Sequence, residues 1–74
     1  MTIGQRAAHA VKVRAWKEET SFFAQCRKID VFDAQLRAWA AGKANPCAVT
    51  LANMYEAGYD IVWILTGKEQ NADG

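Results

Sequence analysis

Three side chains in this 74-residue chain have the chemistry of metal ligands or nucleophiles: His9, Cys26 and Cys47. They are widely and irregularly spaced, whereas zinc sites use closely spaced ligand pairs. The chain also lacks a glycine-rich phosphate loop and a serine–histidine–aspartate set that so small a domain could assemble. The sequence therefore predicts no enzyme, no metal site and no cofactor. We expect the two cysteines to be reduced core thiols of an intracellular protein, although one disulfide between them is conceivable.

Basic side chains are the other candidates for chemistry, and they gather in the first part of the chain. Residues 1–45 hold eight basic and four acidic residues, a net charge of +4, which the overall charge of +1 conceals. Residues 46–74 hold one basic and four acidic residues, a net charge of −3. This asymmetry suits binding of a polyanion at one end of the molecule. Two interpretations remain for the basic residues nearest the middle of the chain, an ordinary solvated face or a set of phosphate contacts: Arg27, Lys28, Arg37 and Lys43.

The composition favours short helices that pack closely. Apolar residues make up 51% of the chain, fourteen of them are alanine, and there is a single proline. Alanine is the best helix former, and its small side chain allows neighbouring helices to approach. A chain of this length holds one small domain, which we assign to residues 1–67. Residues 68–74 are small and polar, and we expect a frayed C-terminal tail.

Five helices and no strand are predicted from apolar residues that recur at helical spacing. The expected spans are 4–18, 22–29, 33–41, 46–57 and 61–65. The expected inner faces hold Ala7, Ala8, Val11, Ala15 and Glu18 in the first helix, Phe22, Cys26 and Ile29 in the second, and Phe32, Leu36, Trp39 and Ala40 in the third. They hold Cys47, Leu51, Met54 and Tyr55 in the fourth helix, and Ile61, Ile64 and Leu65 in the last.

Turn and cap residues support these spans. A serine, threonine or aspartate side chain can accept a hydrogen bond from a first-turn N–H group, and a glycine after a helix can adopt the left-handed conformation that ends it. Asp30 tolerates the same conformation between the second and third helices. Pro46 suits the first turn of the fourth helix. The expected N-caps are Thr20 or Ser21, Asp33 and Asp60, and the expected terminating residues are Gly42, Gly58 and Gly67.

The second and third expected helices form a helix-turn-helix by arrangement, at about residues 21–41. In such a unit one helix enters the major groove of DNA while its partner braces it against the DNA backbone. The stretch 21–67 resembles the lambda-repressor-like (Cro/C1-type, XRE) DNA-binding domains of phages and bacteria. The resemblance lies in residues 36–46, 51–55 and 58–67. Its most specific parts are the Gly-Lys-x-x-Pro spacing from Gly42 to Pro46 and the closing Trp63-Ile64-Leu65-Thr66-Gly67.

The resemblance implies a compact five-helix bundle that binds palindromic operator DNA as a homodimer and regulates transcription, as a phage or prophage repressor or a Cro-like protein does. Ser21 matches the cap of the second helix, and Cys26 matches the small residue where the second and third helices touch. Leu36 and Trp39 match buried positions of the recognition helix. Lys43 matches a phosphate contact just past that helix. The base-reading positions of the family fall on Phe32, Asp33, Ala34, Arg37 and Ala38.

The chain departs from the family pattern at three places. Gln25 stands where an apolar residue is usual, Asp30 where glycine is usual, and Phe22 where a glutamine commonly braces the recognition helix and touches DNA. On the recognition surface, Arg37 can bind guanine through two hydrogen bonds, and alanines can touch thymine methyl groups. Because this surface is rich in alanine and carries the acidic Asp33, the alternative is a protein–protein adaptor or antirepressor on the same scaffold.

The last expected helix has more apolar residues than its length needs. The run 61–65 either closes the core or extends across a dimer interface, and we place Val62 and Trp63 at that interface. Trp39 and Trp63 are expected to be core residues rather than base-stacking platforms. No apolar run approaches the length of a membrane span, and the N-terminus has no signal-peptide block. We therefore expect a cytoplasmic protein, associated with the nucleoid of a bacterial host cell.

Overall fold

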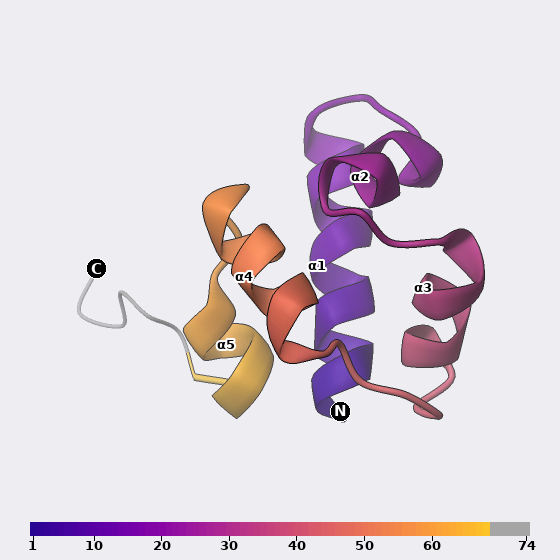
Figure 1. Cartoon of the computed structure of the whole chain (residues 1–74). Helices are drawn as coiled ribbons and strands as arrows, with labels where there is room; N and C mark the ends of the chain where they lie inside the picture. The colour runs from indigo at the N-terminus through magenta and orange to yellow at the C-terminus, as the bar shows by residue number, and fades with distance from the viewer. Residues whose placement is uncertain (69–74) are drawn as a thin grey trace.

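The computed structural model describes residues 1–68, most of which lie in five helices (Figure 1). Within these residues there is no strand, so the predicted all-α class and helix number are confirmed for this part of the chain. The predicted tail lies outside the described residues, apart from Lys68. The helices are α1 (Ile3–Lys17), α2 (Phe22–Lys28), α3 (Asp33–Ala40), α4 (Ala48–Glu56) and α5 (Ile61–Thr66).

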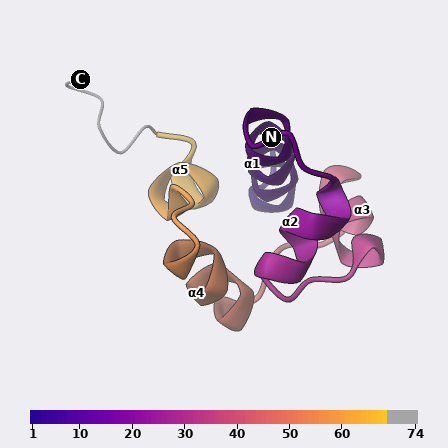
Figure 2. The same cartoon turned by 90° about the horizontal axis from the view of Figure 1, so that it is seen from above.

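Helix α1 is the centre of the arrangement and contacts α2, α3 and α5. Helices α2 and α3 lie on one side of α1, and α4 and α5 lie on the other (Figures 1 and 2). We refer to residues 21–42 as the α2–α3 unit and to residues 47–67 as the α4–α5 unit. The segment between them passes the start of α1, where the Gly4 N–H donates to Asn45 Oδ1 (2.8 Å). A Cβ atom at Gly4 would overlap the carbonyl oxygen of Ala44, so only glycine allows this approach.

The helix starts agree only partly with the predicted caps. Ser21 Oγ accepts from the Ala24 N–H (3.1 Å), and Asp60 Oδ1 accepts from the Trp63 N–H (3.0 Å), so these two caps are confirmed. The prediction for Asp33 was wrong. Phe32 occupies the N-cap position of α3, and its N–H donates to Oε1 of Gln35 (2.9 Å). The capping hydrogen bond is therefore accepted by a side chain in the first turn of the helix instead of by the side chain of the N-cap residue.

The predicted start of α4 at Pro46 was also wrong. Cys47 is the N-cap residue of α4, and Pro46 lies one position before it. A proline fits either place, because its fixed φ angle is compatible with the first turn of a helix and with the extended residue before it.

Left-handed residues follow the helices, at the four predicted positions and also at Glu19, which was not predicted. Asp30 follows α2 with φ 58°, and the Val31 N–H donates to the Cys26 carbonyl oxygen (2.9 Å) across this turn. This crossing hydrogen bond is the Schellman closure of a helix, and it turns the chain sharply toward α3. Left-handed residues also follow or end the other helices: Glu19, Gly42, Gly58 and Gly67.

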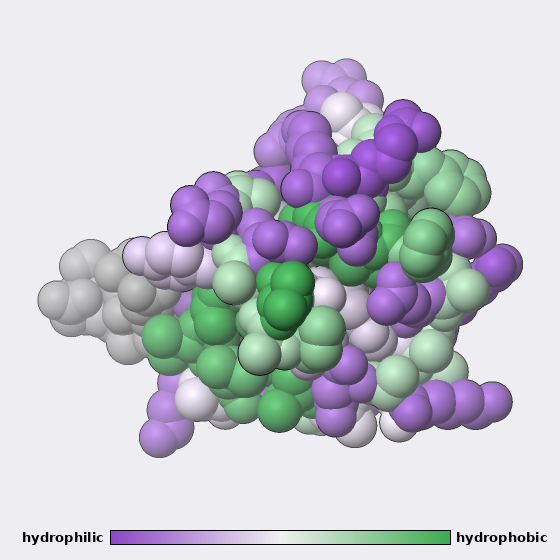
Figure 3. All heavy atoms as spheres, in the orientation of Figure 1, coloured by the Kyte–Doolittle hydropathy of each residue, from purple (hydrophilic) through white to green (hydrophobic). Residues whose placement is uncertain are grey.

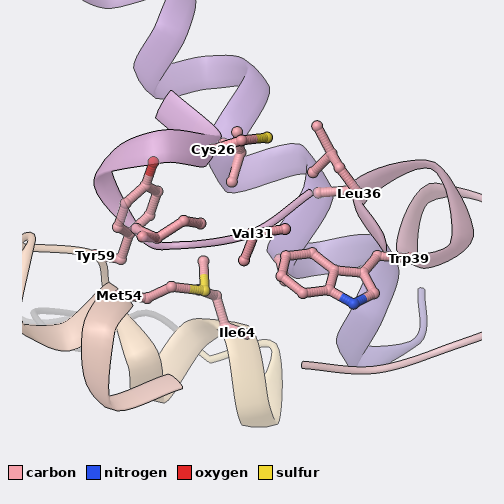
Figure 4. Packing of buried hydrophobic residues seen from close by; sticks show 11 residues of the cluster. Cys26, Val31, Leu36, Trp39, Met54, Tyr59 and Ile64 are labelled. Carbon is pink, nitrogen blue, oxygen red and sulfur yellow. The ribbon is translucent and has the colours of Figure 1, made fainter. Parts of the chain in front are cut away.

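The core lies where α1 meets the other helices (Figure 4). Alanines on α1 let the neighbouring helices approach, and large side chains from both units fill the remaining space. Trp39 is buried, as predicted, and Trp63 is half-buried against the cluster. The buried hydrophobic residues are Ala7, Ala8, Val11, Ala15, Cys26, Ile29, Val31, Leu36, Trp39, Met54, Tyr59 and Ile64.

Seven residues predicted to face inward are exposed instead. Spacing shows which residues share a helix face, but α2 and α5 have only seven and six residues, so few positions reach the core. Glu18 lies just past the end of α1, and Cys47 just before α4, where no helix turns them inward. The exposed residues are Glu18, Phe22, Phe32, Ala40, Cys47, Tyr55 and Leu65.

Candidate nucleic-acid interface

The outward side of α3 is the surface that the sequence predicts to read DNA. Leu36 and Trp39 are buried on the opposite side and fix this helix against α1. Spacing of three and four residues places Ala34, Arg37 and Ala38 together on the outward side. Ala34 and Arg37 are exposed, and Ala38 is half-buried. This side of α3 therefore presents the methyl groups of two alanines and one long side chain, that of Arg37.

Arg37 and Asp33 form an ion pair across one helical turn (Nη2–Oδ2 2.9 Å). Both side chains are open to solvent, and exposed pairs at this spacing contribute only about 0.3–0.5 kcal/mol. A stronger partner therefore displaces the pair at little cost. A guanidinium group can donate two hydrogen bonds to guanine, and a carboxylate can accept one from the amino group of cytosine.

Two exposed phenylalanines stand at the starts of α2 and α3. Phe22 is the first residue of α2 and is 46% exposed, and Phe32 directly precedes α3 and is 79% exposed. The starts of α2 and α3 lie on the same side of the molecule, away from the α4–α5 unit (Figures 1 and 2). Phe23, the next residue of α2, is also exposed. Large apolar side chains gathered at a surface mark a contact with another molecule more often than scattered ones do.

Four basic residues were expected to contact phosphate groups, and the structure divides them into two pairs. Lys28 is bound to Glu18 (Nζ–Oε1 3.1 Å), and Arg37 is bound to Asp33. Arg27 and Lys43 are exposed and have no ion pair within residues 1–68. Of these four residues, the two without an ion pair therefore lie at the end of α2 and just past α3.

Two arginines of α1 have a role that the charge count did not reveal. Arg14 Nη1 donates to the Ala57 carbonyl oxygen (2.6 Å), and its guanidinium lies 4.1 Å from the ring centroid of Tyr59. Arg6 donates from Nε to the carbonyl oxygen of Ile64 (2.8 Å) and from Nη2 to that of Leu65 (3.1 Å). Both arginines therefore bind carbonyl groups at the C-terminal ends of α4 and α5, and they attach this unit to α1.

Gln25 is a polar residue of α2, and it is 1% exposed. Its Nε2 donates to Glu18 Oε1 (2.9 Å) and to Thr20 Oγ1 (2.8 Å), and its Oε1 accepts from the Tyr59 hydroxyl (3.3 Å). Every polar group of the amide thus has a partner, which removes the cost of its burial. The hydrogen bond from Gln25 and the ammonium group of Lys28 lower the pKa of Glu18, whereas burial raises the pKa of Tyr59.

The two residues predicted for a dimer interface differ in position. Val62 is exposed, whereas Trp63 is half-buried and lies against His9, with ring centroids 5.9 Å apart. Hydrophobic residues gather over α4 and α5, while hydrophilic residues predominate over the top of α2 (Figure 3). Further exposed apolar side chains lie on the same two helices: Val49, Tyr55 and Leu65.

The two cysteines are free, and only one of them is in the core. Burial raises the pKa of Cys26. Cys47 is exposed, so the expectation of a second core thiol was wrong; a hydrogen bond from Thr50 (Sγ–Oγ1 3.4 Å) lowers its pKa. Residues 1–68 contain no group of three histidine, cysteine or acidic side chains that could hold a metal ion. None of the helices in this range has the length and apolar character that crossing a membrane requires.

Comparison with known proteins adds no relative: the chain matches no protein-family model, no curated protein and no solved structure.

Proposed function

We propose that this chain is a sequence-specific double-stranded DNA-binding protein that regulates transcription in the bacterial cytoplasm, without catalysis of its own. In this proposal α2 and α3 form a helix-turn-helix, and the outward side of α3 enters the major groove. The observation that carries it is an exposed helix face, with Ala34 and Arg37, on a helix held firmly from behind by Trp39. Exposed cations at the end of α2 and just past α3, Arg27 and Lys43, suit the phosphate groups of the DNA backbone.

A homodimer on a palindromic operator is the second part of the proposal. A single recognition helix of eight residues reads few base pairs, and a two-fold pair of them doubles the site. The apolar surface of the α4–α5 unit, which includes the exposed Val62 and the half-buried Trp63, is the contact that we propose between the two copies.

A protein–protein adaptor or antirepressor is the second candidate function. The exposed side chains of Phe22, Phe23 and Phe32 favour it, because aromatic residues are enriched where proteins bind one another. It requires a stoichiometric protein partner and no affinity for duplex DNA beyond the non-specific level.

The deciding experiment is selection of bound duplexes from a random library at low salt, followed by fluorescence-anisotropy titrations at several salt concentrations. On the selected duplex, Arg37→Ala should reduce the free energy of binding by about 1–3 kcal/mol and relax specificity at one base pair. Lys43→Ala should weaken binding of all sequences similarly and reduce the salt slope by about one. Lys68→Ala, a matched change of charge just past α5, should leave the affinity and the salt slope unchanged. Failure to enrich any duplex would refute DNA recognition, and a captured stoichiometric protein would then support the adaptor.

A further inference from the structure

The polar side chains around the proposed reading surface are already engaged within the protein. Ser21 Oγ accepts from a backbone N–H of α2, and Gln35 Oε1 accepts from the N–H of Phe32. Asp33 and Arg37 are bound to each other. The exposed side chains of Phe22, Phe32 and Ala34 are hydrocarbon and form no such bond. The surface therefore offers apolar contacts beside the hydrogen bonds that Arg37 can form.

The unengaged apolar groups lie at the starts of the two helices. Phe32 is 79% exposed immediately before α3, Ala34 is exposed in the first turn of α3, and Phe22 is 46% exposed as the first residue of α2. The starts of the two helices lie on the same side of the molecule (Figure 2). In a helix-turn-helix the N-terminal residues of the recognition helix meet the base edges. Phe32 and Ala34 thus stand at the end of α3 that would meet the bases, and Phe22 stands at the start of the partner helix.

In the major groove only one base carries an apolar group, because thymine alone has a C5-methyl. We infer that Phe22, Phe32 and Ala34 recognise thymine methyl groups, and that these contacts, together with the hydrogen bonds of Arg37, select the DNA sequence. The inference rests on the proposed DNA-binding function. The charge of the surroundings supports DNA over an apolar protein partner, since Arg27 and Lys43 are exposed without ion pairs in the described chain and complement the phosphates that flank the groove.

The test uses the full chain and the duplex obtained by selection, with each thymine replaced singly by deoxyuridine. This change removes the methyl group and keeps every hydrogen-bonding group of the base. Loss of one buried methyl should weaken binding about fourfold, as expected for the transfer of one such group out of water. We expect at least one thymine in each half-site to show this loss.

Variants identify the side chain that makes each contact. Phe32→Ala and Phe22→Ala should bind thymine and uracil duplexes equally at the position that each residue reads, and circular dichroism should show both to be folded because the side chains are exposed. Tyr55→Ala, which removes an exposed aromatic residue from α4, should keep the wild-type ratio between the two duplexes.

The outcomes separate this inference from the function on which it rests. Tight binding of the selected duplex, with no loss of affinity when any thymine is replaced by deoxyuridine, overturns the methyl-group inference and leaves DNA recognition standing. A uracil effect that persists unchanged in Phe22→Ala and Phe32→Ala also overturns it, because the methyl group then acts through DNA shape. If no duplex is selected, or if a stoichiometric protein is bound through these phenylalanines instead, the DNA-binding function and this inference fall together.

Discussion

The α2–α3 and α4–α5 units are attached to the same helix by different means. The α2–α3 unit buries Ile29, Leu36 and Trp39, so its attachment to α1 is chiefly apolar. The α4–α5 unit also buries apolar residues, but its helix ends are held by hydrogen bonds from Arg6 and Arg14. The difference shows that the positive charges of the first 45 residues serve two purposes. Some bind carbonyl groups of the α4–α5 unit, and others remain exposed at the surface.

The largest expected effect lies in the apolar attachment of the α2–α3 unit. Trp39→Ala should lower the free energy of unfolding by about 3–5 kcal/mol, because it leaves a cavity between α3 and α1. Urea denaturation followed by circular dichroism measures this loss. Trp16→Ala is the matched control, since Trp16 is 80% exposed and its loss should change stability by no more than about 0.5 kcal/mol. Equal effects of the two changes would contradict the assignment of Trp39 as the residue that fixes α3.

A smaller and local effect is expected from the polar attachment of the α4–α5 unit. Arg14→Met keeps much of the apolar stem but removes the hydrogen bond to Ala57 and the cation over Tyr59. The free energy of unfolding should fall by about 1–3 kcal/mol. Hydrogen exchange should show faster opening of amides in α4 and α5, with those of α3 little changed. Lys12→Met, an exposed change on the same helix, is the control. Uniform loss of protection throughout the chain would show that the two units do not open separately.

The polar contacts of the α2–α3 unit should make its attachment sensitive to acid. The pKa of Glu18 is lowered by its hydrogen bond from Gln25 and by Lys28, so the folded state favours the carboxylate. This contribution is complete above the ordinary glutamate pKa of 4.5 and is lost as the pH falls below that value, through the lowered pKa of the folded state. Urea midpoints at pH 7 and below pH 4.5 should differ less in Glu18→Gln than in the wild type. Glu19→Gln, which removes the neighbouring exposed carboxylate, should retain the wild-type difference.

The smallest effect concerns reactivity rather than stability. Cys47, at the start of α4, should react with iodoacetamide at neutral pH well before Cys26, because it is exposed and its pKa is lowered. Cys26, in the α2–α3 unit, is buried with a raised pKa and should react only when the protein unfolds. Mass spectrometry of the Cys47→Ser variant isolates the slow thiol. Rapid labelling of that variant under native conditions would show that the α2–α3 unit opens readily.

The sequence is a good guide to features that depend on neighbouring residues. Ser21 and Asp60 cap helices and Asp30 closes a turn as predicted, because each acts within three or four positions of itself. It is a poorer guide to which face of a short helix meets the core. The helical spacing of apolar residues assigns Phe22 and Phe32 inward. In the structure Ile29, Leu36 and Trp39 of the α2–α3 unit fill the core space beside α1, and both phenylalanine rings are exposed.

Hydrogen bonds between residues far apart in the sequence cannot be predicted from the spacing of apolar residues. Gln25 meets Tyr59, which is 34 positions away, and Arg14 meets Ala57, which is 43 positions away. Nothing in the local spacing distinguishes these side chains from surface ones. In the candidate site, the proposed DNA contacts all lie on the α2–α3 unit or directly after it, and most are exposed. Asp33 and Ala38 are half-buried, and the exposed ones are Phe22, Arg27, Lys28, Phe32, Ala34, Arg37 and Lys43.

The hydrogen bonds from Arg6 to Ile64 and Leu65 have a consequence for the order of folding. They join residues 58 and 59 positions apart, so almost the whole chain must close into a loop before they can form. Closing a long loop costs more conformational entropy than forming the shorter-range contacts among α1, α2 and α3. We therefore expect α1 to pair with α2 and α3 early and α5 to dock last, so that changes at Arg6 speed unfolding and leave the folding rate nearly unaltered.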